Sequence, residues 1–227
     1  MTGGEPTPGA ADARARWVVA SGNAHKIEEL RALLPEVALL GLGAFPPMAE
    51  PVEDAPDFVG NALIKARAVW AHTGAPSLAD DSGISVAALG GAPGVHSARW
   101  VPGTDRDRLE ALLARMAGVA DRHAWFTCAV AVAGLPASLR AAPIPTEAAG
   151  LRWHGDCLVA LGRVDGVLAE AAAGAGGFGY DPIFRLPDGR TLGEVSAAEK
   201  HRISHRARAI EPLRQALAAW RAIGVFP

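Results

Sequence analysis

The segment WVVASGNAHKIEELRALLP, residues 17–35, joins the two periodicities that together define an α/β fold. An apolar run over residues 17–20 is interrupted by Ser21-Gly22-Asn23, and apolar residues then recur at helical spacing until Pro35. A strand that enters a helix through a short turn is the repeating unit of sheets that are covered by helices. We therefore expect an α/β protein with a mixed sheet and helices on its faces.

Similar patterns follow along the chain. Helices are predicted for DFVGNALIKARAVWAHTG, ending at Gly74, for RDRLEALLARMAG, and for residues 204–220 with a kink or break near Pro212. Strands are predicted for VALLGLGAF and PSLADDSG, and a pair of strands for AWFTCAVAVAG and DCLVALGRVDGVLAEAA. Between the paired strands, residues 136–153 are rich in Ala and Pro and read as a flexible insertion or hairpin tip.

Length and composition indicate one folded unit. The 227 residues suffice for a single domain over 17–227, preceded by a Gly-, Pro- and Ala-rich tail, 1–16, that we expect to be disordered. The net charge of -2 gives no reason to expect binding to nucleic acid or membranes. Cys128 and Cys157 lie in apolar runs and read as buried thiols, and no apolar stretch reaches the ~18 residues of a membrane span. A cytoplasmic location is expected.

The turn SGNAHK is a candidate phosphate-binding site. Backbone N–H groups at the start of a helix have no partner in the helix, and the helix dipole makes this end positive. Lys26 adds a full positive charge in the first helical turn, although the spacing is not that of a Walker P-loop. An ordinary strand–turn–helix with a solvated lysine would have the same sequence.

Asp80 and Asp81 end a short apolar run and precede a Ser-Gly pair. Neighbouring side chains of a strand point to opposite faces, so we expect one carboxylate to face a site and the other to hold the turn by accepting backbone N–H groups. Glu53 and Asp54 could serve as further ligands, since Mg²⁺ takes few protein oxygens and completes its shell with water and phosphate. A plain turn is the alternative.

Three further groups of polar residues have open interpretations. Asn61 and Lys65 are four residues apart on one helical face and could approach the same anion, or form a solvated stripe. GGFGYDPIF brings together Phe178, Tyr180 and Asp181, which suit stacking on a base and accepting from its N–H groups, or else form a bulge with a core aromatic. The basic stretch EKHRISHR offers donors for keto oxygens and phosphates, or a solvated helix start.

Taken in order, these motifs resemble the family of inosine triphosphate pyrophosphatases, also called XTP/dITP diphosphatases or Ham1-like proteins. The resemblance runs from about Trp17 to Trp220 and rests on SGNAHK, NALIKA, ADDSGI with GGAPGVHSAR, GFGYDPIF and EKHRISHR. It implies Mg²⁺-dependent hydrolysis of aberrant purine nucleoside triphosphates, such as ITP, dITP and XTP, to the monophosphate and pyrophosphate. It also implies an elongated fold whose active cleft lies between two lobes, and a homodimer.

The resemblance further implies roles for individual residues. Glu53 and Asp81 correspond to metal ligands, and Asp81 also to the proton acceptor, so that Asp80 becomes the structural partner. The implied substrate contacts are Ser21, Gly22, Asn23, Ala24, His25, Lys26, Asn61, Lys65, Ser82, Phe178, Gly179, Tyr180, Asp181, Lys200, His205 and Arg206. His205 and Arg206 are expected to donate to a 6-keto oxygen, which would exclude adenine.

The chain departs from the family pattern in a few places. His25 stands where glycine is common, which we expect to narrow the phosphate turn, and Gly60 replaces a usual glutamate. AAAGAGG lacks an arginine that often precedes GFGYDP, and the insertion at 136–153 is long. Two rival functions therefore stand beside the main one: a Maf-like nucleotide pyrophosphatase with a different base preference, and a nucleotide-binding sensor without turnover.

Overall fold

The computed structural model describes residues 14–227, so most of the predicted tail lies outside the described residues. Strand β1 (Ala15–Val19) begins two residues before the expected start of the domain, because Ala15 and Arg16 pair with the neighbouring strand β2 (Val37–Gly41). The described helices and strands follow the predicted order. The further strands are β3 (Ser77–Val86), β4 (His123–Ala133), β5 (Arg152–His154), β6 (Cys157–Leu168) and β7 (Phe184–Arg185), and the helices are α1 (Ala24–Leu33), α2 (Phe58–Thr73), α3 (Asp105–Arg115), α4 (Ala137–Ala141), α5 (Ala197–Ile203) and α6 (His205–Ala222).

Within residues 14–227 the strands form one mixed sheet in the order β2-β1-β3-β4-β6-β5, with β7 paired to β6. β2, β1 and β3 are parallel, whereas β3, β4, β6 and β5 are antiparallel to their neighbours. The predicted α/β class with a mixed sheet is confirmed, as is the pairing of the strands that became β4 and β6.

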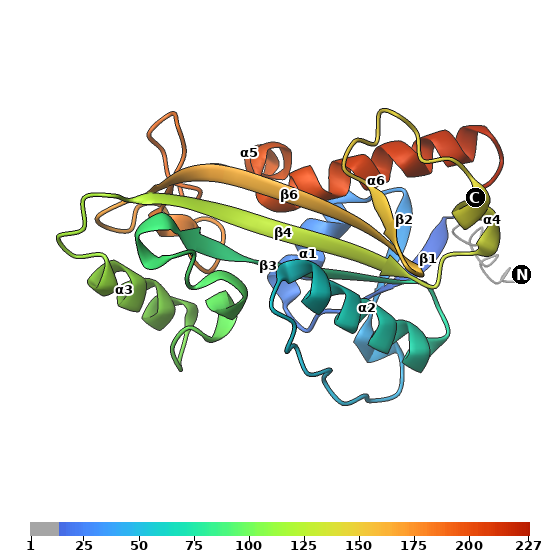
Figure 1. The fold of residues 1–227 in the computed structure, drawn as a ribbon, viewed down its shortest axis with the longest axis horizontal. Helices are drawn as coiled ribbons and strands as arrows, with labels where there is room; N and C mark the ends of the chain where they lie inside the picture. The colour runs from blue at the N-terminus through green and yellow to red at the C-terminus, as the bar shows by residue number, and fades with distance from the viewer. Residues whose placement is uncertain (1–13) are drawn as a thin grey trace, which may run out of the picture.

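The two helices of the parallel part lie on opposite faces of the sheet (Figure 1). Leu30 and Leu34 of the α1 segment pack in one core with Ile210 and Trp220 of α6, whereas α2 packs its Ala62, Ala66 and Val69 against the other face. The chain thus changes faces between β1 and β3. Crevices at the carboxyl ends of parallel strands form at such a point, which makes the end of β1 the expected place for a ligand.

The two aspartates do not lie where strand meets loop. β3 runs on to Val86, and Asp80, Asp81, Ser82 and Gly83 all pair with β4. The expected turn at Ser-Gly is therefore wrong. Pairing with β1 ends at Leu78, so the next residues of β3 continue beyond the end of the shorter strand and face the crevice.

A second, smaller core forms around the far ends of β4 and β6. It contains Leu109 and Leu112 of α3, Ile84 of β3, and Tyr180 and Phe184 from the segment after β6. The long β4 and β6 extend from the first core to this one, and the molecule is correspondingly elongated (Figure 1). This arrangement agrees with two lobes that share one sheet.

The segment 136–153 connects β4 to β6 as a hairpin tip, as one of the two alternatives predicted. It is also part of the core, since it contains α4 and buries Leu139, Ala148 and Leu151 beside α6. Trp220 Nε1 donates to the carbonyl of Pro143 at 3.0 Å. The alternative of a loose insertion is therefore wrong: the segment is attached to the body of the protein.

Three further predictions concern the helix at Pro212, the two cysteines and membrane spans. α6 continues through Pro212, so the helix is not broken there. Both cysteines are buried free thiols, and burial raises the pKa of Cys128 to about 12 and that of Cys157 to about 11. Within residues 14–227, no helix combines the length and the apolar character needed to cross a membrane.

Candidate active site

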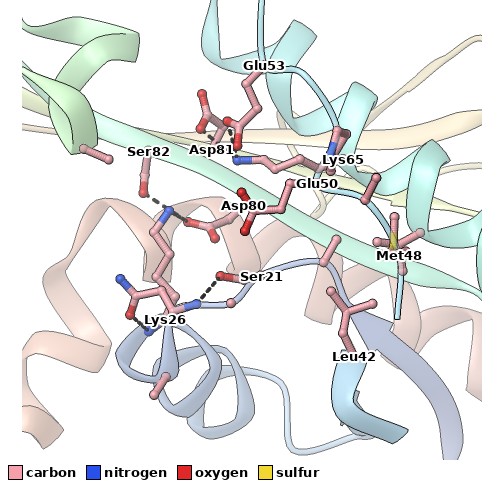
Figure 2. A pocket seen from close by; sticks show the side chains of 18 of the residues that line it. Ser21, Lys26, Leu42, Met48, Glu50, Glu53, Lys65, Asp80, Asp81 and Ser82 are labelled. Atoms are coloured by element: carbon pink, nitrogen blue, oxygen red, sulfur yellow. Dashed lines mark hydrogen bonds and ion pairs between the residues drawn. The ribbon is translucent and has the colours of Figure 1, made fainter. Parts of the chain in front are cut away.

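A cavity of about 720 Å³ opens at the carboxyl end of β1 (Figure 2). Its walls are the turn after β1, the loop 46–53, Lys65 of α2, residues 80–82 of β3, and the short 3₁₀ helix η3 (Gly94–Arg99). Most of the residues predicted for phosphate and metal binding meet here. They are Ser21, Gly22, Asn23, Ala24, Lys26, Glu53, Lys65, Asp81 and Ser82.

The turn 21–26 is shaped by helix capping. Asn23 is the N-cap of α1, and its side-chain oxygen accepts from the backbone N–H of Lys26 at 3.2 Å. Ser21 Oγ accepts from the N–H of Asn23, which closes the turn. The sequence prediction of a helix start that faces open space is confirmed. His25 does not line the cavity, and its ring stacks on Phe178 with 5.5 Å between the ring centroids.

Asp81 faces α2. Lys65 Nζ donates to Asp81 Oδ1 at 2.9 Å and to Glu53 Oε2 at 2.9 Å, so one ammonium group connects the two carboxylates (Figure 2). Burial raises the pKa of Asp81, and the Lys65 charge offsets only part of this effect. Burial would lower the pKa of Lys65, but Asp81 and Asp80 outweigh it and the pKa is raised, so the ammonium group stays charged.

Asn61 shares the α2 face with Lys65, as predicted, but it does not line the cavity. It is fully buried, donates to Asp81 Oδ2 at 3.3 Å and accepts from the N–H of Ala55 at 3.0 Å. The structure therefore gives Asn61 contacts with protein groups, and its expected contact with the substrate stays a prediction. Asn61 holds Asp81 and attaches the loop that carries Glu53.

Asp80 faces the opposite side of β3, as the alternation of strand side chains requires. It accepts from Arg206 at 3.0 Å and from Ser82 Oγ at 3.0 Å, and forms an ion pair with Lys26 at 3.2 Å. Burial would raise the pKa of Asp80, but Lys26 and Arg206 dominate and lower it far below its usual range. Asp80 is structural as expected, although through charged side chains and not through turn amides.

Glu29 completes this charged network, and the sequence analysis missed it. It is buried on α1 and pairs with Arg206 and, at 2.5 Å, with Lys200. Burial would raise the pKa of Glu29, yet Arg206 and Lys200 lower it. The only local signal was its spacing, since Glu29 lies three residues after Lys26 on one side of the helix.

A second, smaller cavity of about 90 Å³ adjoins the first, and Asn23 and Ser82 line both. The predicted base-binding residues gather around it. They are Phe178, Gly179, Tyr180, Asp181, Lys200, His205 and Arg206. Segments far apart in the sequence thus form one cleft, with polyphosphate-binding groups at one end and aromatic and basic groups at the other.

His205 begins α6 and is buried against Phe126, with ring centroids 4.5 Å apart and nearly parallel planes. Burial, together with the charges of Arg206 and Lys200, lowers the pKa of His205 well below its usual value, so the imidazole is neutral near pH 7. Its Nδ1 has no hydrogen-bond partner among the described residues. His205 lines the smaller cavity, and a buried nitrogen without a partner calls for a polar atom nearby.

Hydrogen bonds within the GFGYDP segment and to neighbouring residues hold it in place. Asp181 Oδ2 accepts from the N–H of Phe178 at 2.8 Å and from Lys200 at 2.6 Å, and burial raises its pKa. Tyr180 is buried and its hydroxyl donates to the carbonyl of Ser97, so its ring belongs to the second core. Phe178 is half-buried and lines the smaller cavity, with Lys200 Nζ 4.6 Å from its centroid. The stacking prediction thus fits Phe178 and not Tyr180.

The first turn of α6 packs closely against Gly162 of β6, a contact that was not predicted from the sequence. A Cβ atom at Gly162 of β6 would lie 2.1 Å from the carbonyl oxygen of His205. Only glycine lets the strand and the helix start approach this closely. His205 and Arg206 therefore depend on Gly162 for their position.

The chemistry of the donor set fits a divalent cation. Glu53 and Asp81 already bind one positive group, Lys65, between them, and Glu50 lines the same cavity, whereas Asp54 does not. Asp80 Oδ1 is buried without a hydrogen-bond partner. Over residues 14–227, no three His, Cys, Asp or Glu side chains form a closed metal site. Two carboxylates suit Mg²⁺, which keeps water and phosphate in its remaining positions.

The chain is similar to known proteins over most of its length. Residues 17–216 match the model of the Ham1 family. The chain is 48% identical over 195 residues to a dITP/XTP pyrophosphatase of Symbiobacterium thermophilum, covering 86% of this chain and 91% of that protein. It is 43% identical over 208 residues to a dITP/XTP pyrophosphatase of Streptomyces coelicolor, covering 87% and 94%.

Solved structures agree as well. The Staphylococcus aureus Ham1 protein has a TM-score of 0.75 and 32% identity, covering 90% of this chain and 98% of that chain. A HAM1 protein from Coxiella burnetii has a TM-score of 0.73 and 36% identity, covering 90% and 99%. The fold, the paired cavities and the extent of these matches lead to one conclusion: the chain belongs to the Ham1 family.

Proposed function

We propose that this protein is a hydrolase that converts dITP, ITP and XTP to the nucleoside monophosphate and pyrophosphate, with Mg²⁺ as cofactor. The observation that carries the proposal is the pair of adjoining cavities, one with lysines and carboxylates and the other with Phe178 and His205. Relatives with 41–48% identity are named dITP/XTP pyrophosphatases. The sensor and Maf-like alternatives have no comparable support.

The substrate would lie along the cleft. The base would enter the smaller cavity beside Phe178, and the sugar and first phosphate would pass Asn23 and Ser82, which together with Ala98 line both cavities. The triphosphate would then lie against the N-terminus of α1, with Lys26 and Lys65 offsetting its charge. Both lysines are held by carboxylates, so they are positioned before substrate arrives.

Glu53 and Asp81 would hold the metal ion, which when bound would neutralise negative charge on the phosphate oxygens. Asp81 is also the candidate proton acceptor for the attacking water. Burial raises its pKa, which makes the carboxylate a better base than an exposed aspartate. Asn61 and Lys65 fix both oxygens of Asp81, so the accepting oxygen keeps a constant place. We expect metal binding to be the main role of Asp81 and proton transfer its second role.

Base selection would arise from donors in the smaller cavity. Arg206 is neutralised by Asp80 and Glu29, whereas His205 has an unpaired Nδ1. Donors that meet a 6-keto oxygen are satisfied, but the amino group of adenine would leave buried groups unpaired at about 1–3 kcal/mol each. Keto purines are therefore favoured over adenine.

A homodimer is part of the proposal. Beyond α2, the sheet face formed by β4 and β6 carries Leu161 and Val167, each 40% exposed, beside Arg163 and Asp165. An apolar face with both signs of charge can pair with itself about a two-fold axis. This sheet face is the surface through which we expect the second copy to bind.

The test is an assay with ITP, dITP, XTP, GTP, ATP and dUTP in magnesium buffer, in which ³¹P NMR identifies the phosphate species. Pyrophosphate from ITP, dITP and XTP, with little from ATP, is the expected result. Release of orthophosphate would mean that another bond is cut. Preference for dUTP would support the Maf-like alternative, and binding without release would support a sensor.

A further inference from the structure

Three cationic side chains line the larger cavity, and they differ in how their charges are balanced. Lys26 is paired with Asp80, and Lys65 with both Glu53 and Asp81. Arg99 lines the same cavity, is exposed, and forms no ion pair with a carboxylate of residues 14–227. It is therefore the cavity cation whose charge remains available to an anionic ligand.

The position of Arg99 is fixed at both ends. Its backbone ends η3, in which Ser97 Oγ accepts from the N–H of Ile84 in β3 at 2.9 Å, and Tyr180 donates to the carbonyl of Ser97 at 2.9 Å. Its Nη2 donates to the backbone carbonyl of Glu53 at 3.1 Å. The guanidinium thus lies beside the loop that carries Glu53, anchored to the strand that carries Asp81.

Most of the guanidinium donors of Arg99 remain unused. A guanidinium has five N–H donors in a planar fork, and the contact with Glu53 employs one of its nitrogens. Such a fork binds two phosphate oxygens at once, which a lysine does not. Arg99 is therefore suited to a phosphate group in the cavity.

The relation of the two cavities indicates which phosphate this is. Asn23, Ser82 and Ala98 line both cavities and mark the end near the base, whereas Arg99 and Glu53 line only the larger one. A nucleotide whose base lies against Phe178 would pass Asn23 first and bring its outer phosphates to the side of Glu53.

We propose that Arg99 binds the two outer phosphates of the substrate, which depart together as pyrophosphate, and so favours the transition state in which negative charge grows on this leaving group. The inference rests on the proposed function. It assigns to Arg99 a specific part of that function: a contact with pyrophosphate and not with the nucleoside monophosphate.

The variants Arg99→Ala and Arg99→Lys test this assignment, with Arg152→Ala as the matched control. Arg152 is an exposed arginine of β5 that lines neither cavity of the cleft. Three quantities are measured: kcat and KM for ITP, the inhibition constants of pyrophosphate and of inosine monophosphate, and direct binding of pyrophosphate by calorimetry in magnesium buffer. Urea unfolding of each variant checks that the fold is retained.

Arg99→Ala should weaken pyrophosphate binding by roughly 10–100-fold, the equivalent of a charge-assisted hydrogen bond. Inhibition by inosine monophosphate should change by less than about 2-fold, and kcat/KM should fall with pyrophosphate affinity. Arg99→Lys should recover part of the loss, since it restores charge without the fork. Arg152→Ala should match the wild type.

Unchanged pyrophosphate affinity in Arg99→Ala would overturn the inference. Equal weakening of both products would overturn it too, because it would mean that Arg99 merely holds the Glu53 loop. A wild-type protein that releases no pyrophosphate from ITP would instead refute the proposed function. The calorimetric result still decides, in that case, whether Arg99 binds pyrophosphate.

Discussion

Neighbouring carboxylates in β3 have different roles because successive side chains of a strand point to opposite faces. Asp81 faces Lys65 and Asn61 of α2, whereas Asp80 faces Lys26 and Arg206. Asp81 is thereby available to substrate, and Asp80 is enclosed by cations. A one-residue shift in register would exchange these roles.

Asp81→Asn should lower kcat by roughly 10²–10⁴-fold, because it removes the carboxylate that we propose as metal ligand and proton acceptor. The unfolding free energy should change little. Asp80→Asn should instead destabilise the fold by about 3–5 kcal/mol, because Arg206 and Lys26 lose a buried partner. Steady-state kinetics and urea unfolding of both variants check the contrast, and turnover of Asp81→Asn near the wild-type rate would remove Asp81 from the mechanism.

Acid should weaken the contribution of Asp80 to stability. Its pKa in the folded protein is lowered, so this contribution is complete above the unfolded pKa of about 4 and is lost as pH falls toward the folded value. Because Asn resembles a protonated Asp, the difference in unfolding free energy between wild type and Asp80→Asn should shrink below about pH 4. Urea unfolding between pH 7 and pH 3 measures it, and a constant difference would contradict the assignment.

His205→Phe tests base selection. Phenylalanine can keep the stacking on Phe126 but removes both ring nitrogens, one of which is unpaired. The preference for ITP over ATP, measured as a ratio of kcat/KM values, should fall by roughly 10-fold or more. His201→Phe, outside both cavities of the cleft, is the control. An unchanged preference would exclude His205 as a donor to the base.

At the scale of elements, the loop 46–57 and the start of α2 are fitted to each other. A Cβ atom at Gly60 would lie 2.4 Å from Cβ of Ala55, and the N–H of Ala55 bonds Asn61. The close contact with Ala55 therefore explains why glycine stands at position 60, where the Ham1 family usually has glutamate. It permits the approach of the loop that brings Glu53 to Lys65.

Gly60→Ala should cost about 1–3 kcal/mol through overpacking, and should raise KM as the Glu53 loop moves away. Gly43→Ala is the matched control, since a Cβ atom there meets no neighbour within 4 Å. Adding Ala55→Gly to Gly60→Ala should restore much of the loss. Kinetics and unfolding of the four proteins, wild type included, check this, and wild-type behaviour of Gly60→Ala would show that the loop adapts freely.

At the scale of the whole molecule, the long strands β4 and β6 join two cores and support the cleft between them. The face of these strands beyond α2 leaves Leu161 and Val167 exposed. Arg163 lies over the ring of Trp125 at 4.4 Å on this same face. Exposed apolar side chains on a sheet face favour association.

Leu161→Asp should convert a dimer to a monomer, because it places a charge in the apolar part of the proposed interface. Light scattering after gel filtration measures the mass. Ile223→Asp, at a 62% exposed apolar residue after α6, should leave the mass unchanged. A wild-type monomer, or a Leu161→Asp dimer, would contradict this choice of surface.

Periodicity and helix capping act over a few residues, and they predicted the main helices and strands, the helix start after residue 23 and the opposite orientations of Asp80 and Asp81. The motifs shared with the Ham1 family identified many of the polar residues that line the cleft, but not the loop 46–51, Arg99, Asp105 or Arg108. Tertiary structure alone decided that β3 continues through the aspartates, that Asn61 is buried and that His25 stacks on Phe178. It also recruited Glu29, and it left Arg99 without a carboxylate partner in residues 14–227. Each of these outcomes depends on which distant segment lies opposite a residue, and no local spacing carries that information.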